Sequence, residues 1–297
     1  MPSAKIWFRS TRPFSFTASL TPVLVGTALA ATQGYFHPLY FIAALLGGLF
    51  IHAGSNLFND YFDYKLGADT QPTNGSGLLV QKVLRPEQIY HAALLMFLLA
   101  FLIGIYLVAV RGWVIVALGI GGLLGGYFYT AKPVHLKYRA LGEPLIFLLF
   151  GVLMVWGAWF VQTGSFAWEP MIISVPVALL VTAIVHANNL RDILTDQKAG
   201  FKTLSVHMNP RTSSVFYCGL VALAFLWLLP MVLTGLLEWY VFVALLSLPA
   251  ALKVIKVVRA LDDKPDSPLA FADVMTAQLH MQYGLLLAAG ILVSKWL

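Results

Sequence analysis

Apolar runs follow one another along this chain, and most are long enough to cross a bilayer as a helix, for which about 20 residues are needed. Short polar segments separate them. We place the runs at residues 14–34, 38–59, 90–110, 112–131, 143–163, 170–191, 213–235, 239–258 and 271–294. Their even spread predicts an all-α integral membrane protein, a bundle of nine transmembrane helices forming a single polytopic domain over residues 1–297.

The composition supports this interpretation. Of the 297 residues 59% are hydrophobic and only 11% are charged, whereas soluble domains are about 25% charged. Residues 1–12 are basic, but no small-residue cleavage site follows, so we expect no cleavable signal peptide.

Lys and Arg are distributed unevenly among the loops. Of 19 such residues, 17 lie in the N-terminal segment, or at the end of or after the second, fourth, sixth and eighth runs; the exceptions are Arg111 and Lys295. The positive-inside rule then predicts a cytoplasmic N-terminus and an extracytoplasmic C-terminus, in the cell inner (plasma) membrane. Because 11 of the 13 acidic residues share the basic side, the net charge of +6 indicates topology and a polar working face rather than nucleic-acid binding.

The end of the second run carries a cluster of carboxylates and amides, residues 56–69. Asn56, Asp60 and Asp63 recur at the spacing of one helical face, and Gly67 allows a turn that brings Asp69 back toward it. Close carboxylates raise one another's pKa unless a cation lies between them, and hard oxygen ligands suit Mg²⁺. The alternative is a set of polar residues that only solvates the end of a span.

A matching cluster ends the sixth run, on the same side of the membrane. Asn188, Asp192 and Asp196 stand four residues apart, again on one helical face. We call Asn56, Asp60 and Asp63 the first stripe, and Asn188, Asp192 and Asp196 the second stripe. Solvation explains one stripe more easily than two. Facing each other, they would hold two or three Mg²⁺ around one polyphosphate, and their correspondence suggests a weak internal repeat.

Basic residues on the same side offer partners for phosphate oxygens. The candidates are Arg12, Lys65, Lys132, Lys137 and Lys202. Each taken alone is also explained by the positive-inside rule. There is no Walker-type loop and no Cys/His spacing typical of zinc.

Two segments on the basic side, 64–89 and 192–212, are long enough to hold structure of their own. The first contains a turn cluster, Thr73–Gly77, and then Pro86 and Glu87, which mark a helix start. Both segments suit lids over a surface site, and both suit plain linkers. His52 and His186 lie inside apolar runs, each within a turn of an acidic cluster. They are expected to be hydrogen-bonded interior groups, and the alternative is that they support the site residues.

The two stripes resemble the paired Asp-rich motifs of the UbiA superfamily of intramembrane aromatic prenyltransferases. Segments 59–70 and 188–204 are most similar to the 1,4-dihydroxy-2-naphthoate polyprenyltransferase (MenA) branch, as are Arg12-Pro13, residues 22–28 and residues 141–143. The superfamily's third Asp position is Gly67 here, with Asp69 two residues later. Its Tyr-x-x-x-Lys motif is also altered: Pro133 follows Tyr129 at that spacing, so Lys132 or Lys137 must substitute.

The resemblance implies Mg²⁺-assisted ionisation of a polyprenyl diphosphate to an allylic cation. Transfer of the prenyl group to 1,4-dihydroxy-2-naphthoate, with loss of CO2 and diphosphate, would give demethylmenaquinol for menaquinone biosynthesis. The prenyl tail would lie between apolar helices open to the bilayer. The expected metal ligands are Asp60, Asp63, Asp192 and Asp196, supported by Asn56, Asn188 and Asp69; the expected diphosphate-binding residues are Arg12, Lys65, Tyr129, Lys132, Lys137 and Lys202.

Two alternatives stay open. One is a UbiA-type enzyme with another acceptor, such as 4-hydroxybenzoate, haem or a chlorin. The other is a cation-coupled transporter, although transporter sites normally lie near the bilayer midplane rather than at one interface.

Overall fold

The computed structural model describes residues 2–70, 75–262 and 267–295, and every regular element within them is helical. In chain order the elements are α1 (Ala4–Ser10), η1 (Pro13–Phe16), α2 (Thr17–Thr32), α3 (Pro38–Leu66), α4 (Pro86–Arg111), α5 (Trp113–Phe128), η2 (Leu136–Tyr138), α6 (Gly142–Ile146), η3 (Phe147–Leu153), α7 (Met154–Thr163), α8 (Glu169–Ile173), α9 (Val175–Arg191), α10 (Ile193–Lys198), α11 (Leu204–Leu226), α12 (Leu228–Leu233), η4 (Trp239–Ser247), α13 (Leu248–Ala260), η5 (Pro268–Phe271) and α14 (Ala272–Val293).

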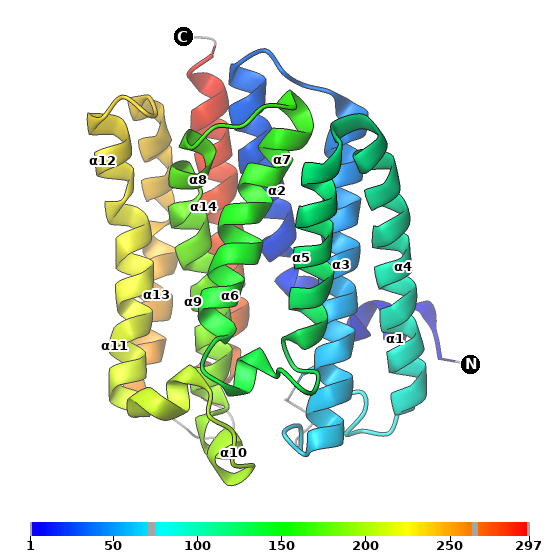
Figure 1. The fold of residues 1–297 in the computed structure, drawn as a ribbon. Coiled ribbons are helices and arrows are strands. Elements are labelled where there is room, and N and C mark those ends of the chain that lie inside the picture. Colours follow the sequence, from blue (N-terminus) through cyan, green and yellow to red (C-terminus); the bar gives the residue numbers. More distant parts are fainter. Residues whose placement is uncertain (1, 71–74, 263–266, 296–297) are drawn as a thin grey trace.

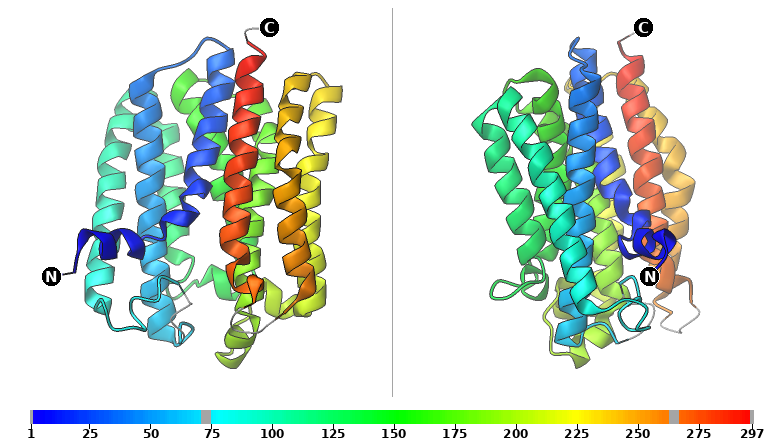
Figure 2. Two further views of the ribbon diagram at one scale, coloured as in Figure 1. Left: turned by 180° about the vertical axis from the view of Figure 1, so that it is seen from behind. Right: turned by 90° about the vertical axis from the view of Figure 1, so that its right-hand side faces the viewer.

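The long helices lie side by side along one axis (Figures 1 and 2). Within the described residues, seven helical segments are long and apolar enough to cross a membrane. The predicted runs 112–131 and 170–191 contain the shorter apolar helices α5 and α9. Helix α4 begins at Pro86, at the predicted helix start ahead of the apolar run 90–110. Helix α11 differs from the prediction: it begins at Leu204, before the run 213–235, and continues through a kink at Asn209, whose φ is 63°.

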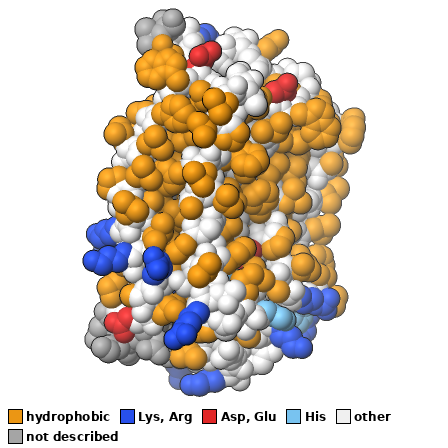
Figure 3. Space-filling model, turned by 90° about the vertical axis from the view of Figure 1, so that its left-hand side faces the viewer, with side chains coloured by type: hydrophobic (Ala, Val, Ile, Leu, Met, Phe, Trp, Pro, Cys, Tyr) orange, Lys and Arg blue, Asp and Glu red, His pale blue; other side chains and the backbone are white. Residues whose placement is uncertain are grey.

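Polar connections gather at one end of the bundle. The segments that follow α3, α5, α9 and α13 lie at the end opposite the C-terminus (Figure 1). Figure 3 shows one flank, on which hydrophobic side chains cover the upper part and most Lys and Arg side chains lie toward the lower end. A surface with an apolar band and a basic end is typical of a membrane protein.

Glycines allow the central helices to approach closely. A Cβ at Gly26 of α2 would lie 2.1 Å from the carbonyl oxygen of Val155 in α7, and one at Gly284 of α14 would lie 1.9 Å from Cγ2 of Thr21 in α2. Small residues at such contacts are the usual means of packing helices in membranes. They fix α2, which follows Arg12, between α7 and α14.

The local signals at the ends of α3 and α4 are confirmed. Gly67 ends α3 in the left-handed conformation, with φ of 76°. Pro86 opens α4, and Oε1 of Gln88 accepts a 2.9 Å hydrogen bond from the backbone N–H of Arg85. Thr73 and Asn74 of the predicted turn cluster lie outside the described residues.

Candidate functional site

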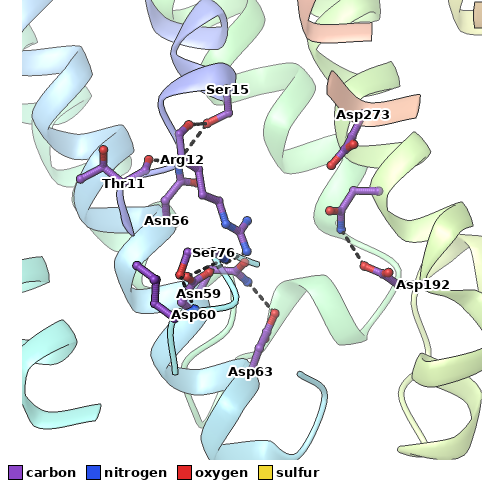
Figure 4. A network of polar contacts seen from close by, with 12 residues as sticks. Thr11, Arg12, Ser15, Asn56, Asn59, Asp60, Asp63, Ser76, Asp192 and Asp273 are labelled. Atoms are coloured by element: carbon purple, nitrogen blue, oxygen red, sulfur yellow. Dashed lines mark hydrogen bonds and ion pairs between the residues drawn. The ribbon is translucent and has the colours of Figure 1, made fainter. Parts of the chain in front are cut away.

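Three chain segments meet at Asp60, which is buried on α3. Its Oδ2 accepts a hydrogen bond of 3.0 Å from the backbone N–H of Ser76, and Nη2 of Arg12 lies 2.6 Å from its Oδ1 (Figure 4). This is an ion pair without hydrogen-bond alignment, since Asp60 Oδ1 has no hydrogen-bond partner among the described residues. Burial lowers the pKa of Arg12, but the nearby carboxylates outweigh burial and raise it above its ordinary value.

Asp63, one turn further along α3, receives three donors. Nζ of Lys137 donates to its Oδ2 at 2.7 Å, Nδ2 of Asn59 donates to the same oxygen at 3.0 Å, and the hydroxyl of Tyr138 donates to Oδ1. Lys137 is itself buried, which lowers its pKa, yet Asp63 and its other anionic neighbours raise that pKa well above the ordinary value. The ammonium of Lys137 therefore stays charged in a site with little water.

Asp69 returns to the first stripe. A Cβ added to Gly75 would lie 2.6 Å from Asp60 Oδ1, 2.7 Å from Arg12 Nη2 and 2.9 Å from Asp69 Oδ2, so all three atoms converge on this glycine. Gly75 has a positive φ of 57°. Burial, together with the charges of Asp63 and Asp60, raises the pKa of Asp69 to about 8. Asp69 thus shares the environment of the first stripe, although it lies on a loop.

The second stripe is arranged around Arg191. The guanidinium donates to both oxygens of Asp192 at 2.9 Å, to Oδ1 of Asn188 at 2.7 Å and to Oδ2 of Asp273 at 2.8 Å. Asp273 lies near the start of α14 (Figure 4), and its contact with Arg191 ties α14 to α9.

The prediction of one uninterrupted helical face is wrong at Asp192. The helix α9 ends at Arg191, and α10 begins at Ile193. The backbone N–H of Asp192 nevertheless donates to the carbonyl of Asn188 at 3.1 Å. The backbone N–H of Asp196 donates to the carbonyl of Asp192 at 2.9 Å. The break is therefore confined to one residue, and the i to i−4 hydrogen bonds link Asn188, Asp192 and Asp196 in sequence.

Residues 129–141 connect the two stripes. Burial raises the pKa of Asp196 to about 6, with Lys137 opposing the shift and Asp192 and Asp63 adding to it. Tyr138 stacks on Phe201, just past α10, with ring centroids 3.9 Å apart. A β-bridge also pairs Arg139 with Lys202. One loop therefore contacts Asp63 on one side and the segment after Asp196 on the other.

A pocket lies between the stripes and extends into the bundle. Its polar end is lined by Arg12, Asn56, Asn59, Tyr129, Lys137, Asn188 and Asp273; its inner part is lined by apolar residues that include Leu145, Leu149, Phe150, Val181 and Ile184. Such a cavity suits an amphiphilic ligand with an anionic head and an apolar tail.

Not all the predicted basic residues join this pocket. Arg12 and Lys137 line it, but Lys65, Lys132 and Lys202 are exposed. Nζ of Lys65 lies 5.7 Å from the ring centroid of Tyr61. Of the two lysines that were alternatives for the altered motif, the structure therefore brings Lys137, and not Lys132, to the carboxylates.

Several polar residues at the site were missed by the sequence reasoning: Ser76, Tyr138, Arg191 as a partner of the second stripe, Asp273, and the buried network of Glu143 and Asn189. Oε1 of Glu143 accepts a 3.0 Å hydrogen bond from Nδ2 of Asn189 and lies 2.9 Å from Nδ1 of His186. The one signal in the sequence was the rarity of acidic residues inside apolar runs, which applies to Glu143 and Asp273.

The expectation for the two histidines is confirmed. His52 contacts the hydroxyls of Ser19 and Ser15 at 3.0 and 3.2 Å. The second nitrogen of His186 lies 2.8 Å from Oγ of Ser213. Both are hydrogen-bonded interior groups.

The donor set fits a divalent cation. Both stripes offer carboxylate and amide oxygens, and Asp60 Oδ1, which is paired with Arg12, accepts no hydrogen bond from the described residues. Burial, with the neighbouring carboxylates adding to it, raises the pKa values of Asp69 and Asp196, and a bound cation would favour the charged form of both. Within the described ranges, no group of three His, Cys, Asp or Glu side chains stands close enough to hold a metal alone. The remaining ligands would thus come from a bound anion or from water.

Known proteins provide an independent comparison. Residues 19–292 match the model described as the UbiA prenyltransferase family. The chain is 34% identical over 291 residues to 1,4-dihydroxy-2-naphthoate octaprenyltransferase of Bacillus subtilis, covering 98% of this chain and 93% of that protein. It is 36% identical over 219 residues to UbiA prenyltransferase domain-containing protein 1 of Rattus norvegicus, covering 72% of this chain and 64% of the relative.

Solved structures show the same fold. A UbiA homolog from Aeropyrum pernix K1 aligns with a TM-score of 0.65 at 15% identity, covering 94% of this chain and 97% of that chain. A UbiA homolog from Archaeoglobus fulgidus, bound to GPP and Mg²⁺, aligns with a TM-score of 0.63 at 17% identity, covering 96% and 99%.

Proposed function

Since this chain belongs to the UbiA prenyltransferase family, we propose that it transfers a polyprenyl group from polyprenyl diphosphate to 1,4-dihydroxy-2-naphthoate, releasing CO2 and diphosphate and giving demethylmenaquinol. The similarity to the Bacillus subtilis naphthoate octaprenyltransferase, which extends over nearly the whole chain, supports this acceptor. The observation that supports the proposal is the pocket, because its polar end is lined by one residue of each stripe, Asn56 and Asn188, and its inner part is apolar.

The topology is part of the proposal. The protein would be a single domain crossing the plasma membrane nine times, with the N-terminus and the stripes facing the cytoplasm. The short helices α5 and α9 would cross together with the adjoining segments. The concentration of Lys and Arg at the end of the bundle that carries the stripes supports this orientation.

The diphosphate of the donor would lie at the polar end of the pocket. Asp60, Asp63, Asp192 and Asp196 would hold Mg²⁺, with Asn56, Asn188 and Asp69 supporting them; when bound, the metal neutralises charge on the leaving diphosphate. Arg12 and Lys137 are permanently charged donors at this place, and a diphosphate oxygen is a better-matched partner than a single carboxylate. Burial raises the pKa of Tyr129, so its hydroxyl also stays protonated and able to donate.

Cleavage of the bond between C1 of the prenyl chain and the diphosphate oxygen leaves an allylic cation, and both bonding electrons depart with the diphosphate. The ring carbon of the naphthoate that bears the carboxylate attacks C1 of the prenyl chain. Loss of CO2 from this carbon then returns the electron pair to the ring. The apolar inner wall, which includes Leu149 and Phe150, excludes water that would otherwise capture the cation.

A direct assay tests the function. The purified protein in lipid nanodiscs is incubated with geranylgeranyl diphosphate, 1,4-dihydroxy-2-naphthoate and Mg²⁺, and the product is identified by mass. We expect the prenylated naphthoquinol without its carboxyl group, and no turnover with excess EDTA.

Parallel reactions with 4-hydroxybenzoate and with haem serve as acceptor controls. A product from either of these, with none from the naphthoate, would refute the proposed acceptor while retaining prenyl transfer. Diphosphate release that continues unchanged in EDTA would refute the role of the metal.

A further inference from the structure

A second cavity adjoins the first inside the bundle. It lies among α2, α3, α4, α5, η3 and α7, and it shares Leu149 and Phe150 of η3 with the first pocket. None of its lining residues has a polar side chain. A ligand there can be recognised only through apolar contact and available room.

Helix α5 runs along both cavities. Gly125 and Gly126 line the first, while Gly119 and Gly122 line the second. Residues 119, 122 and 126 follow one helical face. Side chains of α3 pack against two of them: a Cβ at Gly126 would lie 2.2 Å from Oγ of Ser55, and one at Gly122 would lie 3.3 Å from Cδ1 of Ile51. Gly104 of α4 also lines the second cavity.

The glycines determine how much space is available. At Gly104 and Gly119 no atom lies within 4 Å of an added Cβ, whereas at Gly122 the nearest atom, Cδ1 of Ile51, would lie at 3.3 Å. Side chains at positions 104 and 119 would therefore occupy open space without disturbing the packing of the helices.

We propose that the second cavity holds the distal isoprene units of the polyprenyl donor, and that Gly104 and Gly119 set the chain length it accepts. This inference rests on the proposed function. A donor whose diphosphate lies at the stripes directs its tail inward past Leu149 and Phe150. The distal isoprene units of that tail are apolar, so their burial in an apolar cavity is favourable. The cavity borders the first pocket at Leu149 and Phe150, and its lining has no polar side chain that would have to be desolvated.

The test compares chain lengths in Gly119→Leu and Gly104→Leu. Gly121→Leu is the matched control: it lies on the same helix, its Cβ would also meet nothing within 4 Å, and it lines neither cavity. Replacing glycine by leucine raises helix propensity at all three positions. Each protein in nanodiscs is assayed with geranyl diphosphate and with octaprenyl diphosphate, both with the naphthoate and Mg²⁺.

We expect Gly119→Leu and Gly104→Leu to lower kcat/KM for the octaprenyl donor by about tenfold or more, because each expelled isoprene unit loses its apolar contact. For the geranyl donor the change should stay within about twofold, as should both donors with Gly121→Leu. Equal loss with both donors, or no loss with either, would overturn the inference and would indicate that the cavity holds a bilayer acyl chain or nothing specific.

The two proposals fail in different ways. A wild-type protein that uses neither donor refutes the proposed function, and with it this inference. A wild-type protein that uses both donors, with variants that do not discriminate between them, refutes the chain-length inference alone. Should Gly119→Leu fail to fold, Gly104→Leu decides the question from the opposite wall.

Discussion

The two stripes have similar sequences but are neutralised in different ways. Asp63 of the first stripe is buried and depends on Lys137 and Tyr138, which are distant in the sequence. In the second stripe the side chain of Asp192 is 17% exposed, and its partner is the adjacent Arg191. Charge at the first stripe is thus balanced by tertiary structure, and charge at Asp192 is balanced locally.

Because of this difference, mutations at the two sites should affect activity and stability differently. Where the partner is buried and distant, removal of one charge leaves another charge uncompensated inside the protein. Where the partner is adjacent and partly hydrated, the loss is softened by solvent and by the other contacts of that partner. Asp63 should therefore couple activity to stability, and Asp192 should separate them.

The largest effect is expected for Asp63→Asn. Prenyl transfer should fall by at least about a hundredfold, as for other preorganised electrostatic groups. The free energy of unfolding should fall by about 3–5 kcal/mol, because the buried ammonium of Lys137 loses its partner. Product formation and denaturant unfolding in detergent measure the two. The double variant Asp63→Asn/Lys137→Met should regain stability and remain inactive; a stable single variant would contradict the comparison.

Asp192→Asn should lose comparable activity with little loss of stability. We expect prenyl transfer to fall by about a hundredfold and the free energy of unfolding to change by less than about 1 kcal/mol. The reason is that Arg191 retains Asp273 and Asn188 as hydrogen-bond acceptors. The same two measurements apply. Destabilisation as large as that of Asp63→Asn would show that the two stripes do not differ in this respect.

Gly75→Ala should cause a smaller loss, of about tenfold in activity, because its methyl group would enter the space shared by Asp60, Arg12 and Asp69. Gly67→Ala is the control for backbone strain alone. Gly67 has φ of 76°, but no atom of the described residues lies within 4 Å of its added Cβ. Both variants should lose about 1 kcal/mol of stability, and only Gly75→Ala should impair steady-state turnover. Equal impairment would remove the role assigned to the cluster around Gly75.

The smallest effects are expected at the exposed lysines. Lys65→Met, Lys132→Met and Lys202→Met should each retain activity within about twofold, since screened surface charges contribute little. Lys137→Met, assayed beside them at the same donor concentrations, should lose at least about tenfold. A large loss in any of the three exposed variants would show that the loop which carries it closes onto the diphosphate during turnover.

Hydropathy and charge predicted the helices and the two acidic stripes, because both follow from patterns local to the chain. The sequence could not decide between Lys132 and Lys137, because this choice depends on the path of residues 129–141 in space. The break at Asp192 was also missed: its four-residue spacing is the same in a continuous helix and in one interrupted at a single residue. Partners such as Asp273 lie 82 residues from Arg191, beyond the reach of any local pattern.

The distances along the chain also impose an order on the assembly of the site during synthesis. Lys137 follows Asp63 by 74 residues, and translation proceeds at about 5–20 residues per second. For several seconds, therefore, the nascent chain carries the Asp63 carboxylate without Lys137, and hydration of this charge favours keeping the end of α3 in water at the membrane surface. Arg191 likewise has no contact with Asp273 until α14 has been synthesised. The contacts of Asp63 can therefore form during translation, whereas the contact between α9 and α14 forms only after α14 has been made.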